Sequence, residues 1–268
     1  MKFCANLTLL YNEVPFLERF ACAAADGFSA VEIQFPYDTP IVEIQQQLKE
    51  HNLRCVLINV PAGDLMQGGE GLAAVPSKVA EYAAGLVECM AYARALKVEY
   101  VNVLAGRCYD NSKRAAYLNT FYQNLYKTAE AFAPFRIYTT FEAINTDDMP
   151  GFLISTTDDF LTTIKEVNHP YLKAQFDVYH MAKMGQNIEG FIQTHTDKIG
   201  HIQFADVPER GEPGSGELDF AKVFKTIMGS GYDGWMAAEY KPTTNTSDSL
   251  KWMKRLNGVF NKKELEQV

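Results

Sequence analysis

Four polar side chains in the second half of the chain stand at the ends of consecutive apolar segments. They are Glu142 in RIYTTFEA, Asp177 in LKAQFDVYH, Gln203 in IGHIQFAD and Glu239 in WMAAEYKP. Each segment is typical of a buried strand, and the intervals of 26 to 36 residues leave room for a helix between successive strands. Because the carboxyl ends of parallel strands meet at one mouth of a barrel, we expect the four side chains to converge there.

The chemistry of these four side chains predicts a divalent metal site. Three carboxylates in one place would repel one another unless a cation lay among them. All four side chains offer oxygen ligands, which suit Mg²⁺ or Mn²⁺, whereas thiolates or several imidazoles would indicate zinc. Such a metal polarises a carbonyl and its neighbouring hydroxyl, and so acidifies the carbon-bound proton between them. The predicted metal ligands are Glu142, Asp177, Gln203 and Glu239, and Glu142 and Glu239 are also the predicted general base and acid of a proton transfer through an enediolate.

Further polar residues near the same strand ends are candidates for substrate binding. His180 follows Asp177 by three residues, and we expect it in the loop that leaves the sixth strand, in contact with the substrate. Arg210 and Lys241 follow the seventh and eighth strands, where either could bind a carboxylate; a guanidinium can donate two parallel hydrogen bonds to one. Weaker candidates are Arg107 after the fourth strand and Asn6 and Asn59 at the ends of the first and third strands.

A second histidine, His201, lies two residues before Gln203 and therefore faces the same side of its strand, one layer deeper. We interpret it as a buried, hydrogen-bonded group and not as a fifth metal ligand.

Short apolar runs alternate with longer amphipathic stretches along nearly the whole chain, which predicts an α/β protein with eight β-α units. The expected strands cover residues 2–7, 30–35, 54–59, 100–104, 136–142, 173–177, 199–204 and 235–239. The expected helices cover residues 14–25, 41–51, 78–96, 112–133, 157–167, 187–196, 219–230 and 247–260. We predict a single (β/α)₈ TIM-barrel domain over residues 1–268. An open doubly wound sheet is less favoured, because ANLTLLYNE after the first strand has no glycine for a phosphate-binding turn; for the same reason we expect no nucleotide cofactor.

Composition narrows the range of partners. The net charge of −8 makes nucleic acid or an anionic membrane a poor partner, whereas a small anionic hydroxy or oxo acid could still bind beside local positive charge. No run approaches the roughly 20 apolar residues of a membrane span. The five cysteines are odd in number and show no CxxC spacing, which favours reduced, mostly buried thiols and a cytoplasmic location. The oligomeric state is left open by the sequence.

The chain resembles the hydroxypyruvate isomerase family of xylose-isomerase-like barrels over essentially its whole length. The blocks that carry the resemblance are FCANLTLLYNEVPFLERF, VEIQFPYD, INVPAGD, FEAINTDDMPGF, FDVYHMAKM, DKIGHIQFADVPERGEPGSGELDF and GWMAAEYKP. Membership implies isomerisation of hydroxypyruvate to tartronate semialdehyde (2-hydroxy-3-oxopropanoate) without an organic cofactor. It also implies that Glu142 and Glu239 are the two catalytic glutamates and that His180 is the substrate histidine.

Several alternatives remain open from the sequence. The 2-oxo-tetronate isomerases share nearly the same blocks and act on a four-carbon acid, so the ligand positions do not separate the two reactions. Ketose 3-epimerases resemble this plan, but they carry histidine where this chain has Gln203. A DNA-repair nuclease on the same barrel would need zinc ligands and a basic surface. A barrel that only binds a sugar acid is disfavoured by the intact oxygen ligands.

Overall fold

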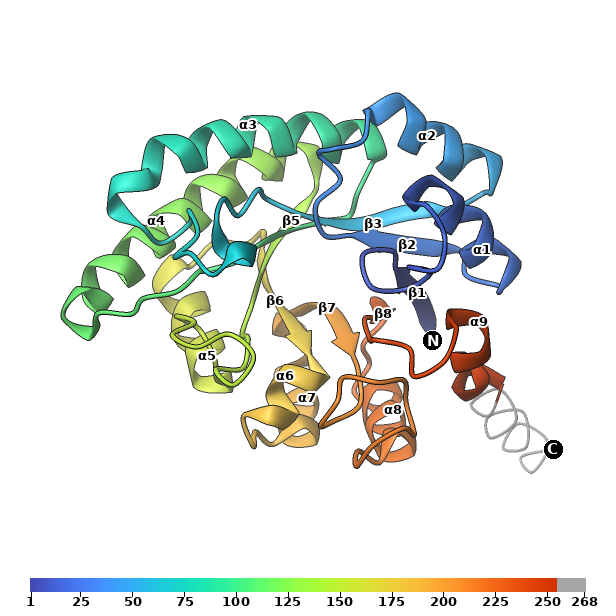
Figure 1. The fold of residues 1–268 in the computed structure, drawn as a ribbon. Helices are drawn as coiled ribbons and strands as arrows, with labels where there is room; N and C mark the ends of the chain where they lie inside the picture. Colours follow the sequence, from blue (N-terminus) through green and yellow to red (C-terminus); the bar gives the residue numbers. More distant parts are fainter. Residues whose placement is uncertain (255–268) are drawn as a thin grey trace.

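The computed structural model describes residues 1–254 and contains eight parallel strands that close into a barrel (Figure 1). Each strand pairs with the next one in the sequence, and β1 pairs with β8. The strands are β1 (Lys2–Asn6), β2 (Ala30–Ile33), β3 (Arg54–Asn59), β4 (Tyr100–Val103), β5 (Tyr138–Glu142), β6 (Leu172–Asp177), β7 (Ile199–Phe204) and β8 (Trp235–Ala238). The predicted TIM barrel is confirmed; β3 and β7 have the predicted bounds, and the other strands differ by one or two residues at one end.

Helices surround the barrel, with α2, α3 and α4 along the top of Figure 1 and α5 to α8 along the bottom. They are α1 (Arg19–Ala25), α2 (Ile41–Glu50), α3 (Val79–Leu96), α4 (Arg114–Phe132), α5 (Thr157–Val167), α6 (Val178–Lys183), α7 (Ile188–His195), α8 (Phe220–Gly229) and α9 (Thr246–Ser249). The first begins five residues later than predicted, after a short 3₁₀ turn at Phe16–Glu18. The short helix α6 was not predicted. The last prediction, 247–260, extends beyond the described residues.

The register of the barrel sets polar side chains of neighbouring strands opposite one another near the carboxyl ends. Asn6 on β1 pairs with Glu32 on β2, and Asp177 on β6 pairs with Gln203 on β7. Glu142 on β5 lies opposite Gln175 on β6. Parallel strands buried on both faces normally carry apolar residues, so this polar layer is unusual. Because its side chains are buried, they need hydrogen-bond partners inside the barrel.

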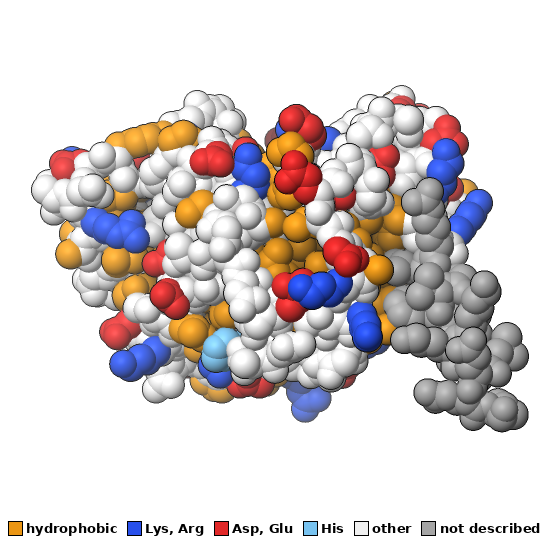
Figure 2. All heavy atoms as spheres, turned by 90° about the horizontal axis from the view of Figure 1, so that it is seen from below, with side chains coloured by type: hydrophobic (Ala, Val, Ile, Leu, Met, Phe, Trp, Pro, Cys, Tyr) orange, Lys and Arg blue, Asp and Glu red, His pale blue; other side chains and the backbone are white. Residues whose placement is uncertain are grey.

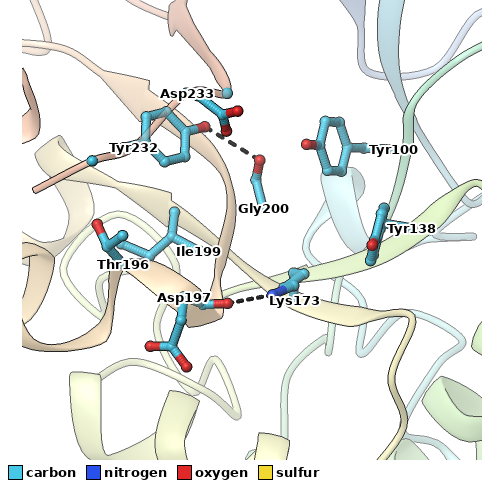
Figure 3. Close-up of a pocket in the computed structure, with 11 residues that line it drawn as sticks. Tyr100, Tyr138, Lys173, Thr196, Asp197, Ile199, Gly200, Tyr232 and Asp233 are labelled. Atoms are coloured by element: carbon cyan, nitrogen blue, oxygen red, sulfur yellow. Dashed lines mark hydrogen bonds between the residues drawn. The ribbon is translucent and has the colours of Figure 1, made fainter.

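The opposite end of the barrel has a separate hollow of about 370 Å³, close to the first residues of β4, β5, β6 and β7 (Figure 3). There the Tyr232 hydroxyl donates a hydrogen bond to the Gly200 carbonyl at 3.2 Å, and the Lys173 ammonium donates one to the Asp197 carbonyl. Residues at the amino-terminal face of such a barrel usually contribute to stability. This hollow is therefore remote from the polar layer at the strand ends.

The five cysteines are free thiols, as predicted, and four of them, Cys4, Cys55, Cys89 and Cys108, are buried. Among the described residues, none of the helices is long and apolar enough to cross a membrane.

Candidate active site

The four predicted metal ligands all lie at the carboxyl ends of strands β5 to β8 and are almost completely buried. Glu142 and Asp177 are the last residues of their strands, and Gln203 is the penultimate residue of β7. Glu239 follows β8 directly, because the strand ends at Ala238 and not at Glu239 as predicted; its amide still donates to the Phe204 carbonyl at 3.2 Å. The structure therefore brings together side chains from four separate β-α units in a desolvated layer.

Glu239 is the most heavily hydrogen-bonded carboxylate of this layer. Its four donors are Gln34 Nε2 at 2.6 Å, Asn6 Nδ2 at 3.0 Å and Gln203 Nε2 at 3.2 Å on Oε1, and Arg210 Nη2 at 2.6 Å on Oε2. Burial raises the pKa of Glu239 to about 8, although the Arg210 guanidinium opposes that shift. The donors thus offset part of the effect of burial, which favours the protonated form.

Glu142 has far fewer partners. Its Oε2 accepts one hydrogen bond from Gln175 Nε2 at 3.1 Å, and its Oε1 lies 3.6 Å from His180 Nε2. Burial, followed by the charges of Glu239 and Asp177, raises the pKa of Glu142 well above its usual range. The partners of the two carboxyl groups therefore differ: four donors stabilise the ionised form of Glu239, whereas Glu142 has one amide donor to offset its burial.

His180 lies on α6 and not in a loop, which corrects the prediction from sequence. The helix begins immediately after Asp177, whose side chain accepts the backbone N–H of Tyr179 at 2.8 Å and caps the helix. The cap explains why the chain turns at once into a helix here.

The hydrogen bonds of His180 determine its tautomer. Asn145 Nδ2 lies 2.7 Å from Nδ1, and because an amide nitrogen can only donate, Nδ1 is the acceptor. Burial lowers the pKa of His180 well below its usual value, so the ring is neutral and its proton is on Nε2. This Nε2–H is 3.5 Å from Asp177 Oδ2 and faces the carboxylates as a donor. That arrangement suits contact with a substrate oxygen better than metal ligation.

Arg210 is placed between two of the carboxylates. Its Nη2 lies 2.6 Å from Glu239 Oε2 and 3.7 Å from Asp177 Oδ2, and its guanidinium stacks 5.0 Å from the Tyr179 ring centre. The backbone of Arg210 is left-handed, with φ at +61°, a conformation that a residue other than glycine adopts only when its surroundings hold it there. Arg210 therefore supplies a fixed positive charge at the centre of the site.

The donor set fits a hard divalent cation. Asp177 Oδ2 is buried and has no hydrogen-bond partner among the described residues, which is costly unless a further donor or cation approaches it. Ligand atoms of Glu142, Asp177 and His180 lie within 4.8 Å of one another. The Gln203 amide nitrogen faces Glu239, and the Gln203 carbonyl oxygen, the predicted ligand atom, accepts a hydrogen bond from Gln175 at 2.7 Å.

Two adjacent cavities lead to these groups. The inner cavity, of about 70 Å³, is lined by Gln34, Asn59, Glu142, His180, Arg210 and Glu239 together with apolar side chains. The outer cavity, of about 600 Å³, is lined by Arg107, Lys183 and Lys241 among others. The two cavities share the side chains of Met66, Asp148, Met149 and Arg210.

The cavities separate the predicted substrate-binding residues into three groups. Asn59 and His180 border the inner cavity, Arg210 borders both, and Lys241 and Arg107 border the outer one. Asn6 instead points its amide at Glu239 and Glu32, so it contacts the carboxylates and lines neither cavity.

Sequence reasoning missed four polar residues that complete the layer: Glu32, Gln34, Asn145 and Gln175. An acid in the middle of the apolar stretch AVEIQF is a signal that could have identified Glu32. The prediction that His201 is a buried, hydrogen-bonded group is confirmed, because its Nε2 lies 2.6 Å from Glu32 Oε2.

Several known proteins are similar to this chain in sequence or in fold. A family model described as a xylose isomerase-like TIM barrel matches residues 20–256. Hydroxypyruvate isomerase of Escherichia coli (strain K12) is 40% identical over 253 residues, covering 94% of this chain and 98% of that protein. The 2-oxo-tetronate isomerase of Cupriavidus necator is also 40% identical over 253 residues, covering 94% and 97%. A crystal structure described as AP endonuclease, family 2, from Brucella melitensis is 36% identical, with a TM-score of 0.91, covering 95% of this chain and 99% of that one.

These relatives, together with the barrel and its polar layer, define an isomerase that acts on a small molecule. The chain belongs to the xylose isomerase-like TIM-barrel family, as its sequence blocks predicted.

The buried carboxylates should make the metal-free protein less stable as the pH rises from about 6.5 to 8. Across this window the folded state retains a proton on Glu239, whose pKa is about 8, while the unfolded state has released it near 4.5, so unfolding becomes more favourable as the pH rises. Glu142 and Asp177, whose pKa values are also raised, act in the same direction. His180 acts in the opposite direction only below its usual value of 6.5.

Thermal denaturation of the chelated protein at four pH values in this window measures the effect. Glu239→Gln should flatten the slope, because the variant lacks the titrating carboxyl group. A melting temperature that rises steadily from pH 6.5 to 8 would contradict the prediction.

Proposed function

We propose that this protein interconverts hydroxypyruvate and tartronate semialdehyde (2-hydroxy-3-oxopropanoate). The observation that carries the proposal is the buried set of Glu142, Asp177 and Glu239 beside a small inner cavity, with a guanidinium between two of them. Strong relatives named for isomerisation of hydroxypyruvate and of 2-oxo-tetronate support it. We also propose that residues 1–268 function as one isomerase domain, because the eight strands close a single barrel.

The two glutamates divide the proton transfer between them. Glu239, whose ionised form is stabilised by four hydrogen-bond donors, acts in that form as the base: it removes a proton from C3 of hydroxypyruvate and leaves an enediolate over C2 and C3. Glu142, which has one amide donor and a raised pKa, is the protonated partner that delivers a proton to C2. The proton on the C3 oxygen passes to the C2 oxygen, so that the product carries an aldehyde at C3 and a hydroxyl at C2.

A divalent metal, Mg²⁺ or Mn²⁺, would be held by Glu142, Asp177, Gln203 and Glu239. When bound, it would polarise the carbonyl and hydroxyl oxygens of the substrate. The unpartnered Asp177 Oδ2 supports this part of the proposal, because it is a buried oxygen that requires a cation or a donor.

The remaining polar residues bind the substrate. The Arg210 guanidinium would hold its carboxylate, and the His180 Nε2–H would donate to an oxygen on the reacting carbons. Asn59 lines the same cavity, and Asn6 contributes through Glu239. Lys241 lies in the outer cavity, where it would attract an anionic substrate or meet the far end of a longer one.

The first test is incubation of the purified protein with hydroxypyruvate, and separately with 2-oxo- and 3-oxo-tetronate, in deuterated water. Proton NMR follows the product with added Mg²⁺ or Mn²⁺ and again after chelation. Deuterium at the new carbinol carbon, with activity that chelation removes, is the expected result. The absence of turnover with all three acids would overturn the proposal and direct attention to neutral ketoses.

The four-carbon reaction is the second candidate, and one observation favours it. The inner cavity, of about 70 Å³, adjoins the larger outer cavity of about 600 Å³, and a longer acid would extend into that cationic outer cavity. Turnover of the tetronate acids alone would preserve the mechanism and change the substrate. A nuclease role is not favoured: Figure 2 shows acidic and basic side chains interspersed around a hollow with hydrophobic lining on one face, and the chain carries a net charge of −8.

Arg210→Met should raise the KM for hydroxypyruvate by about tenfold or more, because hydrogen bonds to a charged group contribute about 1.5–3 kcal/mol. Mn²⁺ binding should stay the same or tighten, since the variant removes a positive charge beside Glu239 and Asp177. Steady-state kinetics and Mn²⁺ titration measure the two effects, with Lys241→Met as the outer-cavity control. A collapse of kcat at unchanged KM would show that Arg210 serves Glu239 and not the substrate.

A further inference from the structure

Glu32 is a fully buried carboxylate that lies beneath the candidate active site. It occupies the third position of β2 and is not among the residues that line either cavity. Its Oε1 accepts hydrogen bonds from Asn6 Nδ2 at 2.7 Å and Gln203 Nε2 at 2.8 Å, and its Oε2 lies 2.6 Å from His201 Nε2. A carboxylate removed from water in this way persists only because these donors compensate its desolvation.

The two side chains that donate to Glu32 Oε1 also donate to Glu239. Asn6 Nδ2 reaches Glu239 Oε1 at 3.0 Å, and Gln203 Nε2 reaches the same oxygen at 3.2 Å. The two carboxylates are thus linked through two shared amide groups, one from β1 and one from β7. A change in the position of Glu32 would therefore alter a hydrogen bond of each amide that also donates to Glu239.

The same contacts fix the orientation of the Gln203 amide. Its nitrogen faces Glu32 and Glu239, while its oxygen accepts from Gln175 Nε2 at 2.7 Å, and Gln175 Nε2 also donates to Glu142 at 3.1 Å. A flipped amide would set its oxygen against two carboxylate oxygens and its nitrogen against the Gln175 nitrogen. Glu32 therefore acts as an acceptor that permits only one orientation.

We propose that Glu32 is a positioning residue: it orients the Gln203 amide and aligns Asn6 on Glu239, so that the carboxylates and the Gln203 carbonyl oxygen are held in place for substrate and metal. The inference rests on the proposed function only for its kinetic and metal readouts. The hydrogen-bond geometry itself stands independently of what the site binds. Residues that hold ligands in this way commonly change metal affinity or activity by 10–100-fold.

Two conservative substitutions separate the position of the acceptor oxygen of residue 32 from the charge of its side chain. Glu32→Gln keeps an oxygen at the same reach, so Asn6 and Gln203 retain their acceptor. Its new NH₂ group can donate to His201 Nε2 once the ring proton moves to Nδ1, an atom without a hydrogen-bond partner among residues 1–254. Glu32→Asp keeps the charge but withdraws the carboxylate by one methylene from both amides. Positioning therefore predicts that Glu32→Gln is the milder change.

The experiment compares wild type, Glu32→Gln and Glu32→Asp in three measurements: Mn²⁺ affinity, kcat and KM with hydroxypyruvate, and the side-chain amide NMR signals of protein labelled with ¹⁵N-glutamine. The Gln203 signal is assigned by its absence from Gln203→Ala. Thermal denaturation verifies that each variant folds. We expect Glu32→Asp to lose about tenfold or more in Mn²⁺ affinity and kcat, with a smaller change in KM, and to shift the Gln203 signal. Glu32→Gln should retain most of the Mn²⁺ affinity and most of the kcat of wild type, together with an ordered Gln203 signal.

Wild-type behaviour of Glu32→Asp in all three measurements would overturn the proposal. Greater damage in Glu32→Gln than in Glu32→Asp would overturn it too, because the negative charge and not the acceptor position would then matter. If wild type neither binds Mn²⁺ nor converts hydroxypyruvate, the proposed function fails, while the Gln203 amide signal in the two variants still decides whether Glu32 positions that side chain.

Discussion

Glu142→Gln and Glu239→Gln should each lower kcat by at least about 10²-fold, the lower end of what a positioned general acid or base contributes. An amide keeps the size of the side chain but can neither accept the substrate proton nor deliver one. Both residues are nearly inaccessible to water, at 5% and 2% exposure, so solvent would not readily replace the missing group. Initial rates with hydroxypyruvate measure the loss, and circular dichroism verifies the fold.

Isotope exchange separates the two roles. Without its acid, Glu142→Gln should still exchange the C3 protons of hydroxypyruvate with deuterated water while forming little product. Glu239→Gln should lose both exchange and product, since it lacks the base. The exposed Glu50→Gln is the matched control and should behave as wild type. Near-normal turnover in either active-site variant would contradict the mechanism, and exchange retained only in Glu239→Gln would reverse the two roles.

Asp177→Asn should lower Mn²⁺ affinity by at least about tenfold and reduce metal-dependent turnover to a comparable or greater extent. The reason is that Asp177 Oδ2 is a buried anionic oxygen without a hydrogen-bond partner in the described part of the chain. The same change should not lower the melting temperature of the metal-free protein, because it removes a charge close to Glu142 and Glu239. Mn²⁺ titration and thermal denaturation of the chelated protein measure the two effects.

A nearby carboxylate gives the control for this substitution. Asp147 lies in the segment after β5, and its side chain is 66% exposed and pairs with Lys183 at 3.5 Å. Asp147→Asn should leave Mn²⁺ affinity unchanged, because an exposed ion pair contributes little. Equal Mn²⁺ affinity in Asp177→Asn and wild type would remove Asp177 from the metal site.

Much of the architecture could be predicted because it depends on local patterns. Apolar runs with helical stretches between them specify β-α units, and the absence of glycine after β1 argued against an open nucleotide-binding sheet. The positions of Glu142, Asp177, Gln203 and Glu239 followed from the same reasoning, since a polar residue that ends a buried strand has to lie at the barrel mouth. Prediction was less accurate at α6, because a single capping carboxylate starts that helix.

The sequence by itself therefore determined the barrel and the strand ends at which its carboxylates lie. Only the tertiary structure decided how those side chains meet. Closure of β1 against β8 brings Asn6 to Glu239, and the interior of the barrel brings Glu32 to His201, 169 residues later in the chain. A left-handed backbone at Arg210 turns its guanidinium between Asp177 and Glu239. Periodicity along a chain reports burial and element type, whereas hydrogen bonds between distant side chains depend on register and closure, which only the folded barrel fixes.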